Sequence, residues 1–277
     1  MDASTGRWDP AQYARFADDR GRPFFDLLAR VSHPGPTRVV DLGCGPGDLT
    51  ATLLDRWPGA RIEGVDSSPE MVAEFRRRID GAAQPGTSTS GAGRPGLSVH
   101  QADLREWVTT AAPASYDVVV SNAALQWVPG HVTLLPQVAA LLAPGGQLAI
   151  QIPGNHESPS HTLLRELATS EPFAQHVGRL AQRPALPGPA DYLSALSALG
   201  LVVDAWETTY LHVLHGPDPV WEWIRGTGAR PVLQGLPDPL REEFADVYRA
   251  RLREAYPAQE HGTVLPFRRV FAVGRRD

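Results

Sequence analysis

The chain has 277 residues, of which 42% are hydrophobic and 21% are charged, and its formal net charge is −5. This length allows one α/β domain with an appended unit, and the composition is ordinary for a globular protein. The acidic balance argues against a nucleic-acid partner, which usually needs a basic face. No apolar run approaches the roughly 20 residues of a membrane span.

Cysteine use and the N-terminal segment indicate the compartment. Cys44 is the single cysteine, so an intrachain disulfide is excluded. The first seven residues, from Met1 to Arg7, lack the basic start and apolar run of a signal peptide. We therefore expect a cytoplasmic protein with no membrane contact and no obligate protein partner.

Strands and helices alternate along the first 150 residues. Apolar residues at helical spacing between Pro10 and Val31 predict a helix that is broken near Gly21 and Pro23. Strands are predicted at 38–42, 61–66, 97–101, 116–120 and 147–152, and helices at 49–57, 70–79 and 132–142. Pro144-Gly145-Gly146 predicts a turn before the last of these strands. This order is typical of a parallel, doubly wound sheet.

The second half of the chain has a different texture. The segment from Gly81 to Gly96 contains no large apolar residue and predicts a mobile surface loop. Beyond Pro153, helices are predicted at 160–169, 191–199, 220–225 and 240–255, and strands at 201–214 and 268–275. We expect a Rossmann-like sheet of seven mostly parallel strands with an antiparallel last pair. The expected domains are a core at 1–153 with an N-terminal helical lid, and a helical cap at 154–277 interleaved with the last two strands.

A glycine-rich segment, Asp41-Leu42-Gly43-Cys44-Gly45-Pro46-Gly47, joins the first strand to its helix. Glycines allow a sharp turn and a close approach of backbone to ligand at a helix N-terminus. In a dinucleotide enzyme this helix end receives a pyrophosphate. The carboxylate of Asp41 would repel a pyrophosphate, so a ligand with an ammonium and a sulfonium fits this position better.

Two further aspartates follow the next two strands. Asp66 ends the second strand and can accept hydrogen bonds from ribose hydroxyls, and Asp103 follows the third and can accept one from an adenine amino group. A lone aspartate at such a place is more often a turn or cap residue. Three carboxylates at successive strand ends beside a glycine loop are a stronger signal of a ligand site.

The order DLGCGPG, GVDSS, AD and PGG resembles class I S-adenosylmethionine-dependent methyltransferases over Val39 to Ile152. The resemblance implies S-adenosylmethionine as cofactor and no bound metal. The expected cofactor-binding residues are Asp41, Gly43, Cys44, Gly45, Gly47, Asp66, Ser67, Met71, Ala102, Asp103, Leu104 and Asn122. Met71 is equally consistent with ordinary core packing, and the small size of Cys44 rather than its thiol is expected to matter.

The segment after the fourth strand, Ser121 to Trp127, faces the methyl group in that family's fold. It lacks the Asn/Asp-Pro-Pro-aromatic motif of DNA-type amino methyltransferases, so methylation of a base or amide is disfavoured. A carboxylate acceptor is already ionised at neutral pH and needs no general base. We therefore expect no catalytic acid or base, and catalysis by alignment and exclusion of water.

The wider chain, including SNAALQW, Pro153-Gly154-Asn155, Ser160-His161 and Gly226-Thr227-Gly228-Ala229-Arg230-Pro231, is similar to the trans-aconitate 2-methyltransferase family. The resemblance implies a monomethyl ester of a small carboxylate substrate, trans-aconitate. The expected substrate-binding residues are Tyr13, Arg20, Gln126, Trp127, His161 and Arg230. Four of the six also have an ordinary interpretation: Tyr13 and Trp127 as core, His161 as a helix-terminal contact and Arg230 as a solvated surface residue.

Three other functions compete with this hypothesis. A malonyl-carrier-protein methyl esterase has a similar stretch after the fourth strand but should carry a basic docking patch. A phenolic O-methyltransferase should carry a base aimed at the methyl group. A non-catalytic protein that only binds S-adenosylmethionine would need no cation-rich acceptor pocket.

Overall fold

A computed structural model of the chain describes the backbone of residues 17–81, 96–181 and 186–277, with side chains from residue 21 onward. Its internal contacts divide the chain into two compact units. The sheet unit comprises Arg20–Pro153, Pro187–Glu207 and Val270–Asp277, and the helical unit contains Gly154–Leu186 and Thr208–Arg269. Strands β6 and β8 each have residues in both units.

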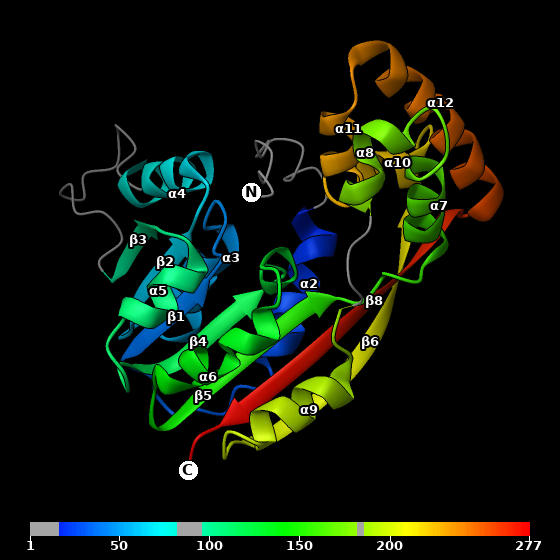
Figure 1. Ribbon diagram of the computed structural model, residues 1–277. Coiled ribbons are helices and arrows are strands. Elements are labelled where there is room, and N and C mark those ends of the chain that lie inside the picture. Colours follow the sequence, from blue (N-terminus) through cyan, green and yellow to red (C-terminus); the bar gives the residue numbers. More distant parts are fainter. Residues whose placement is uncertain (1–16, 82–95, 182–185) are drawn as a thin grey trace. The chain divides into compact units, whose positions relative to one another are not determined.

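The strands form one mixed sheet in the order β3-β2-β1-β4-β5-β8-β6, with the short β7 paired to β8 (Figure 1). Their bounds are β1 Arg38–Leu42, β2 Arg61–Asp66, β3 Leu97–Gln101, β4 Tyr116–Asn122, β5 Leu142–Pro153, β6 Val202–Leu214, β7 Ala258–Gln259 and β8 Gly262–Arg275. Strands β1 to β5 pair in parallel. In Figure 1 the arrow of β8 points against those of β4 and β5. The Rossmann-like sheet with an antiparallel last pair is confirmed, and β7 is an additional short strand.

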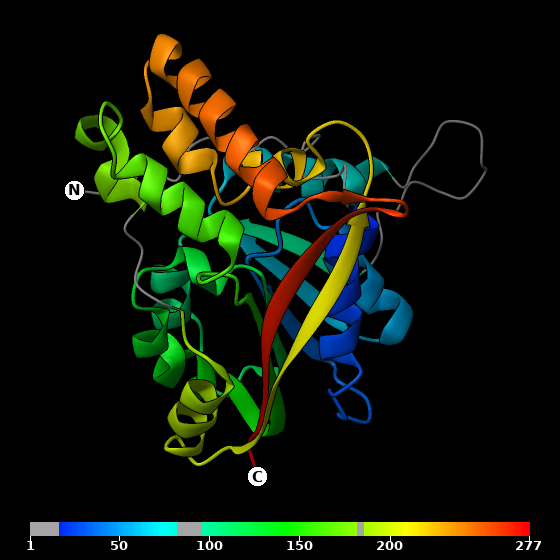
Figure 2. The same ribbon diagram turned by 90° about the vertical axis from the view of Figure 1, so that its right-hand side faces the viewer.

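The central strands are buried because helices cover both faces of the sheet. Val39 and Val40 of β1 and Val118, Val119 and Val120 of β4 are fully buried, as expected for parallel strands with near-continuous apolar runs. Helices α2 and α3 lie on one face and α5 and α6 on the other (Figures 1 and 2). The helices of the sheet unit are α2 Ala17–Leu28, α3 Asp48–Arg56, α4 Pro69–Gly81, α5 Leu104–Thr110, α6 Leu135–Ala140 and α9 Pro189–Ser197.

The predicted break near Gly21 and Pro23 was wrong, because α2 continues through both residues. Phe24 and Leu27 are fully buried on this helix, and their packing outweighs the loss of one backbone hydrogen bond at the proline. A methyl group at Gly21 would touch Leu49 of α3 at 3.4 Å. Gly21 therefore marks a close contact between helices rather than the end of one.

The predicted turn before the fifth strand was also wrong. Strand β5 begins at Leu142, and Pro144-Gly145-Gly146 form an irregularity inside it. Tyr116 of β4 pairs with Leu142, whereas Val118 pairs with Gln147, so β5 gains residues relative to its partner. The predicted helix at 132–142 is shorter, a 3-10 turn at His131–Leu134 followed by α6.

The helical unit has its own hydrophobic core. Its helices are α7 Pro159–Ala168, α8 Ala174–Ala181, α10 Pro219–Arg225, α11 Arg230–Gly235 and α12 Asp238–Ala255. Trp223, Phe244 and Tyr248 are almost completely buried in this core. Helices α8 and α11 were not predicted, since both are short, and β8 starts at Gly262 rather than at the predicted 268. The predicted mobile loop falls on residues 82–95, outside the described ranges.

Candidate cofactor and acceptor sites

The glycine loop after β1 has the left-handed backbone that its sequence predicts. Gly43, Gly45 and Gly47 have φ angles of 84°, 56° and 83°. A Cβ at Gly43 would lie 2.1 Å from Cβ of Ala124, and a Cβ at Gly47 would lie 2.3 Å from the ring of Phe75. A Cβ at Gly45 would meet no atom within 4 Å. One side of this loop therefore packs tightly and the side at Gly45 is open to a ligand.

Asp41 is a buried carboxyl group that forms no ion pair with any cationic side chain in the described ranges. It is 3% exposed, and the Thr50 hydroxyl donates a hydrogen bond to its Oδ2 at 2.6 Å. Burial, partly offset by this hydrogen bond and increased by the charge of Asp66, raises the pKa of Asp41 to about 7. A ligand that brings a positive charge to this carboxyl group would favour its ionised form.

Asp66 ties the glycine loop to the end of β2. Its Oδ2 accepts the backbone N–H of Gly45 at 2.9 Å, and its Oδ1 accepts that of Ser68 at 2.9 Å. Burial raises the pKa of Asp66, and these backbone hydrogen bonds oppose the rise. Each carboxylate oxygen has a further lone pair that can accept a hydroxyl hydrogen bond.

Asp103 caps helix α5. Its Oδ1 accepts the backbone N–H of Arg105 at 2.8 Å, and the Arg105 guanidinium donates to both oxygens. The Arg105 hydrogen bond lowers the pKa of Asp103. The capping interpretation of Asp103 is thus correct, and its contact with adenine stays a prediction.

The other residues expected at the adenine end differ in exposure. Leu104 and Met71 are buried, Ala102 is half-buried and Ser67 is exposed. The backbone N–H of Ala102 donates to the carbonyl of Asp66 at 3.0 Å, which fixes the ends of β2 and β3 relative to each other. The burial of Met71 in α4 is consistent with both of its interpretations.

Cys44 is held where its size matters. A Cβ at Gly64 of β2 would lie 2.8 Å from Cys44 Sγ, so the thiol and this glycine fit together. Burial raises the pKa of the Cys44 thiol well above its usual value. The thiol therefore stays protonated at neutral pH, as expected for a packing residue.

Strain and unpaired polar atoms mark the segment after β4. Ala123 has a φ of 53°, rare for a residue with a Cβ, and its N–H donates to the carbonyl of Gln151 at 2.9 Å. Gln126 Nε2 donates to the carbonyl of Ala123 at 2.6 Å. Asn122 Oδ1 and Gln126 Oε1 are buried and have no hydrogen-bond partner among the described residues. Such a concentration of strain and unpaired acceptors is characteristic of ligand sites.

The residues at the carboxyl ends of β1, β2 and β4 form a corner of the sheet unit that fits S-adenosylmethionine. Gly45 offers an open backbone surface, and Asp66 offers carboxylate lone pairs for ribose hydroxyls. Asn122 Oδ1 offers an acceptor to an ammonium, and Asp41 supplies a carboxyl group close by. Carboxylates and carbonyl oxygens suit a cationic ligand and would repel a diphosphate. Among the described residues, no group of three His, Cys, Asp or Glu side chains is arranged to hold a metal ion.

Comparison with known proteins identifies the family. Residues 13–198 match the model of a methyltransferase domain. Over the whole length of both chains the sequence is 53% identical to the trans-aconitate 2-methyltransferase of Streptomyces avermitilis. The chain belongs to the trans-aconitate 2-methyltransferase family. The homologous enzyme of Streptomyces coelicolor is 52% identical, over all of this chain and 89% of its own.

Solved structures share the fold at low sequence identity. The YcgJ protein of Bacillus subtilis has a TM-score of 0.56 at 14% identity, over 91% of this chain and 97% of its own. Phosphoethanolamine N-methyltransferase 2 of Haemonchus contortus, solved with S-adenosyl-L-methionine, has a TM-score of 0.54 at 16% identity, over 92% of this chain and 53% of its own. The predicted family, fold and enzyme class of this methyltransferase are thereby confirmed.

Within the helical unit of this methyltransferase, two predicted substrate-binding residues belong to neighbouring segments. His161 Nδ1 lies 3.1 Å from Ser158 Oγ and 3.3 Å from Ser160 Oγ. A Cβ at Gly228 would lie 3.0 Å from His161 Nε2, so the loop before Arg230 packs against this histidine. Arg230 is buried, at 6% exposure, so its interpretation as a solvated surface residue was wrong.

The other predicted substrate-binding residues are less well defined. Trp127 and Gln126 are half-buried in the 3-10 turn Leu125–Trp127. Arg20 belongs to helix α2, but its side chain lies outside the described part of the chain, as does all of Tyr13. Their contacts with a substrate stay predictions.

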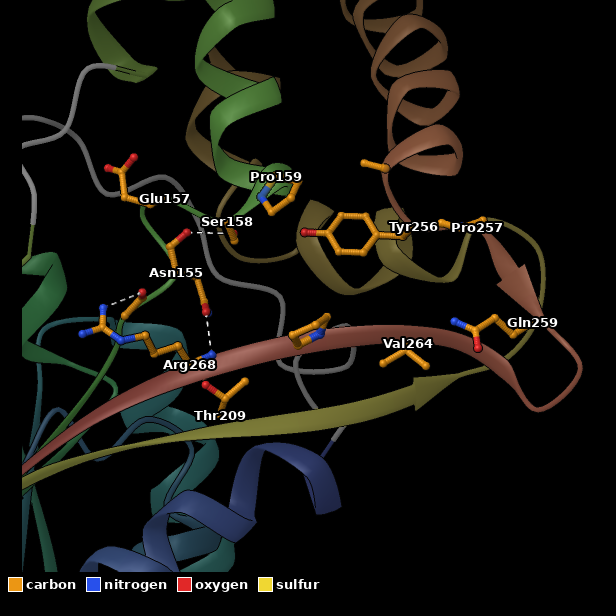
Figure 3. Close-up of a pocket in the computed structure, with 13 residues that line it drawn as sticks. Asn155, Glu157, Ser158, Pro159, Thr209, Tyr256, Pro257, Gln259, Val264 and Arg268 are labelled. Atoms are coloured by element: carbon orange, nitrogen blue, oxygen red, sulfur yellow. Dashed lines mark hydrogen bonds between the residues drawn. The ribbon is translucent and has the colours of Figure 1, made fainter.

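A cavity of about 630 Å³ in the helical unit was not predicted (Figure 3). Asn155, Tyr256 and Arg268 line it, and the Arg268 backbone N–H donates to Asn155 Oδ1 at 2.7 Å. Asn155 Nδ2 is buried without a partner. Of the six predicted substrate-binding residues, the four whose side chains are described, Gln126, Trp127, His161 and Arg230, do not line this cavity. Gly154 and Asn155, from the segment Pro153-Gly154-Asn155 that supports the family resemblance, are among its lining residues.

Proposed function

We propose that this chain transfers a methyl group from S-adenosylmethionine to a carboxylate of trans-aconitate and forms a monomethyl ester. The observation that carries the proposal is the 53% identity, over the full length of both chains, to a trans-aconitate 2-methyltransferase. The match extends through both units, so the segments that distinguish one acceptor from another are included. The carboxylate-lined corner at the ends of β1 and β2 supports the choice of cofactor.

The residues of the chain bind and orient rather than exchange protons. S-adenosylmethionine, when bound, would supply a methyl group on a sulfonium; a carboxylate oxygen can attack this carbon without a base, and the S–CH₃ bond breaks as S-adenosylhomocysteine leaves. We assign its methionine end to the loop of Gly43, Gly45 and Gly47 with Asp41 and Asn122. Asp66 accepts from the ribose, and Asp103, Leu104 and Met71 border the adenine. Alignment and exclusion of water account for the rate.

An acceptor panel tests the substrate. The protein is incubated with methyl-labelled S-adenosylmethionine and either trans-aconitate, cis-aconitate, citrate, a malonyl thioester or a simple phenol. We expect trans-aconitate to give the highest kcat/KM. A higher kcat/KM with the malonyl thioester or the phenol would show that trans-aconitate is not the preferred acceptor. Cofactor binding without methyl transfer to any compound of the panel would show that the protein only binds S-adenosylmethionine.

Arg230 is proposed to pair with a carboxylate of the acceptor. Arg230 is buried, a guanidinium can donate charged hydrogen bonds to a carboxylate, and the loss of such a bond costs about 1.5–3 kcal/mol. Arg230→Lys should therefore raise the KM for trans-aconitate roughly 10-fold or more, with an unchanged Kd for S-adenosylmethionine. Arg225→Lys is the matched control, because Arg225 is on the neighbouring helix α10 and pairs with Glu222 at the surface. Equal KM values in the two variants would remove Arg230 from the acceptor site.

We further infer that the enzyme acts in the cytoplasm on a small-molecule substrate. The single cysteine supports this compartment, since the chain has no intrachain disulfide to maintain. None of the helices in the described ranges has the length and apolar character of a membrane span.

A further inference from the structure

Gln151 near the end of β5 is a buried amide with no hydrogen bond from its side chain. It is fully buried, and neither Nε2 nor Oε1 has a hydrogen-bond partner in the part of the chain that the structure describes. Its strand neighbours Leu148, Ile150 and Ile152 are apolar and equally buried. A buried amide without partners costs folding free energy that an apolar side chain of the same size would not cost. An unpaired group of this kind in a folded protein calls for an explanation outside folding.

The position of Gln151 indicates a ligand. Gln151 pairs in register with Asn122 of β4, so the two side chains project from the same face of the sheet. The carbonyl of Gln151 also holds the strained Ala123 through its N–H. In sheets of this type ligands bind at the carboxyl ends of the strands, where Asn122 and Gln151 lie.

Gln147, on the same strand, has a hydrogen-bond partner for its side-chain NH₂ group, although its Oε1 has none among the described residues. It lies four residues earlier on the same face and is 3% exposed. Its Nε2 donates to Ser32 Oγ at 3.2 Å, so its donor group has a partner within the protein. Of these two glutamines on β5, the one whose Nε2 has no partner among the described residues is Gln151, at the end of the strand where the reaction is expected.

We propose that Gln151 binds the acceptor, with its Nε2 donating a hydrogen bond to a carboxylate of the substrate; this rests on the proposed function. A neutral N–H donor orients a carboxylate without protonating it, and it leaves the oxygen more electron-rich than a guanidinium would. The unpaired Oδ1 of Asn122, a pure acceptor, suits the cationic cofactor instead. The proposal therefore assigns the anion to Nε2 of Gln151 and the cation to Oδ1 of Asn122.

Gln151→Met tests this directly, because methionine matches glutamine in length and removes both polar atoms. We expect the KM for trans-aconitate to rise about 10-fold or more, with a Kd for S-adenosylmethionine within twofold of wild type and an equal or higher Tm. A merely structural amide would give the opposite pair of results, a lower Tm and an unchanged KM. Gln147→Met is the matched control and should leave both KM and Kd unchanged.

Gln151→Glu is the second variant and keeps the polar shape. At pH 8 its carboxylate should repel the substrate and raise the KM more than methionine does, and the KM should fall again as the pH is lowered and the glutamate is protonated. Unchanged KM values in both variants, with an active wild-type enzyme, would overturn the role of Gln151. A wild-type enzyme that does not methylate trans-aconitate would overturn the proposed function and this inference with it.

Discussion

Replacing Gly45 with alanine should weaken S-adenosylmethionine binding about 100-fold and lower the stability of the free protein only slightly. Gly45 has a φ of 56°, which costs alanine about 1 kcal/mol. The added methyl group would meet no protein atom within 4 Å, so the fold can accept it. The same methyl group would occupy the open side of the loop that we assign to the cofactor. Calorimetry of cofactor binding and thermal unfolding measure the two effects separately.

Two other glycines serve as controls for Gly45. Gly43→Ala should damage the fold itself, because its Cβ would lie 2.1 Å from Ala124. Gly59→Ala should change neither binding nor stability appreciably, since its Cβ would meet open space away from the glycine loop. Full cofactor affinity in Gly45→Ala would show that the ligand does not contact the open side of this loop.

Replacing Asp41 with asparagine should stabilise the free protein at pH 8 and weaken cofactor binding. The pKa of Asp41 is about 7 in the folded protein and near the ordinary 3.8 in the unfolded chain. The folded state therefore binds more protons between these values, and stability falls as the pH rises from about 4 to 7. Above pH 7 the full cost applies, about 4 kcal/mol by the shift. Urea unfolding of the wild-type protein and of Asp41→Asn at pH 5 and pH 8 measures this cost.

Cofactor binding should reverse the preference of Asp41 for its protonated form. The cationic ligand favours the ionised carboxylate, so wild-type affinity should increase with pH up to about 7 and binding should release a proton. Asp41→Asn should bind more weakly and lose the pH dependence. Asp117→Asn is a control of opposite sign, because burial, which would raise the pKa of Asp117, is outweighed by hydrogen bonds from Thr37 and Arg38 that lower it. Proton uptake on binding, or a pH-independent wild-type affinity, would contradict the assignment of Asp41 to the cofactor.

The local sequence predicted the sheet well where the apolar runs were continuous. The bounds of β1, β2 and β3 agree with the prediction because each strand is a short run bordered by turn residues. Predictions based on single glycines and prolines failed twice, at Gly21 and Pro23 in α2 and at Gly145 in β5. There, burial of neighbouring side chains and pairing with β4 determine the backbone, and neither can be read from a local pattern.

The candidate site could be predicted only in part for a related reason. The glycine loop, Asp41 and Asp66 are adjacent to strand ends in the sequence, so their proximity follows from the fold class. Gln151 lies inside an apolar strand, and nothing in the sequence distinguishes it from Gln147, whose Nε2 donates to Ser32. Only the packed structure shows that its amide has no partner.

Transfer itself tests the central claim most directly. The protein is mixed with S-adenosylmethionine that carries ¹³C in the transferred methyl group and with an excess of trans-aconitate, and the carbon is followed by NMR. We predict that the label appears as the methyl ester of trans-aconitate and that mild base releases it as methanol. Label that stays in S-adenosylmethionine would contradict the account. So would a labelled methyl group bonded to a phenol oxygen, a nitrogen or a thioether sulfur.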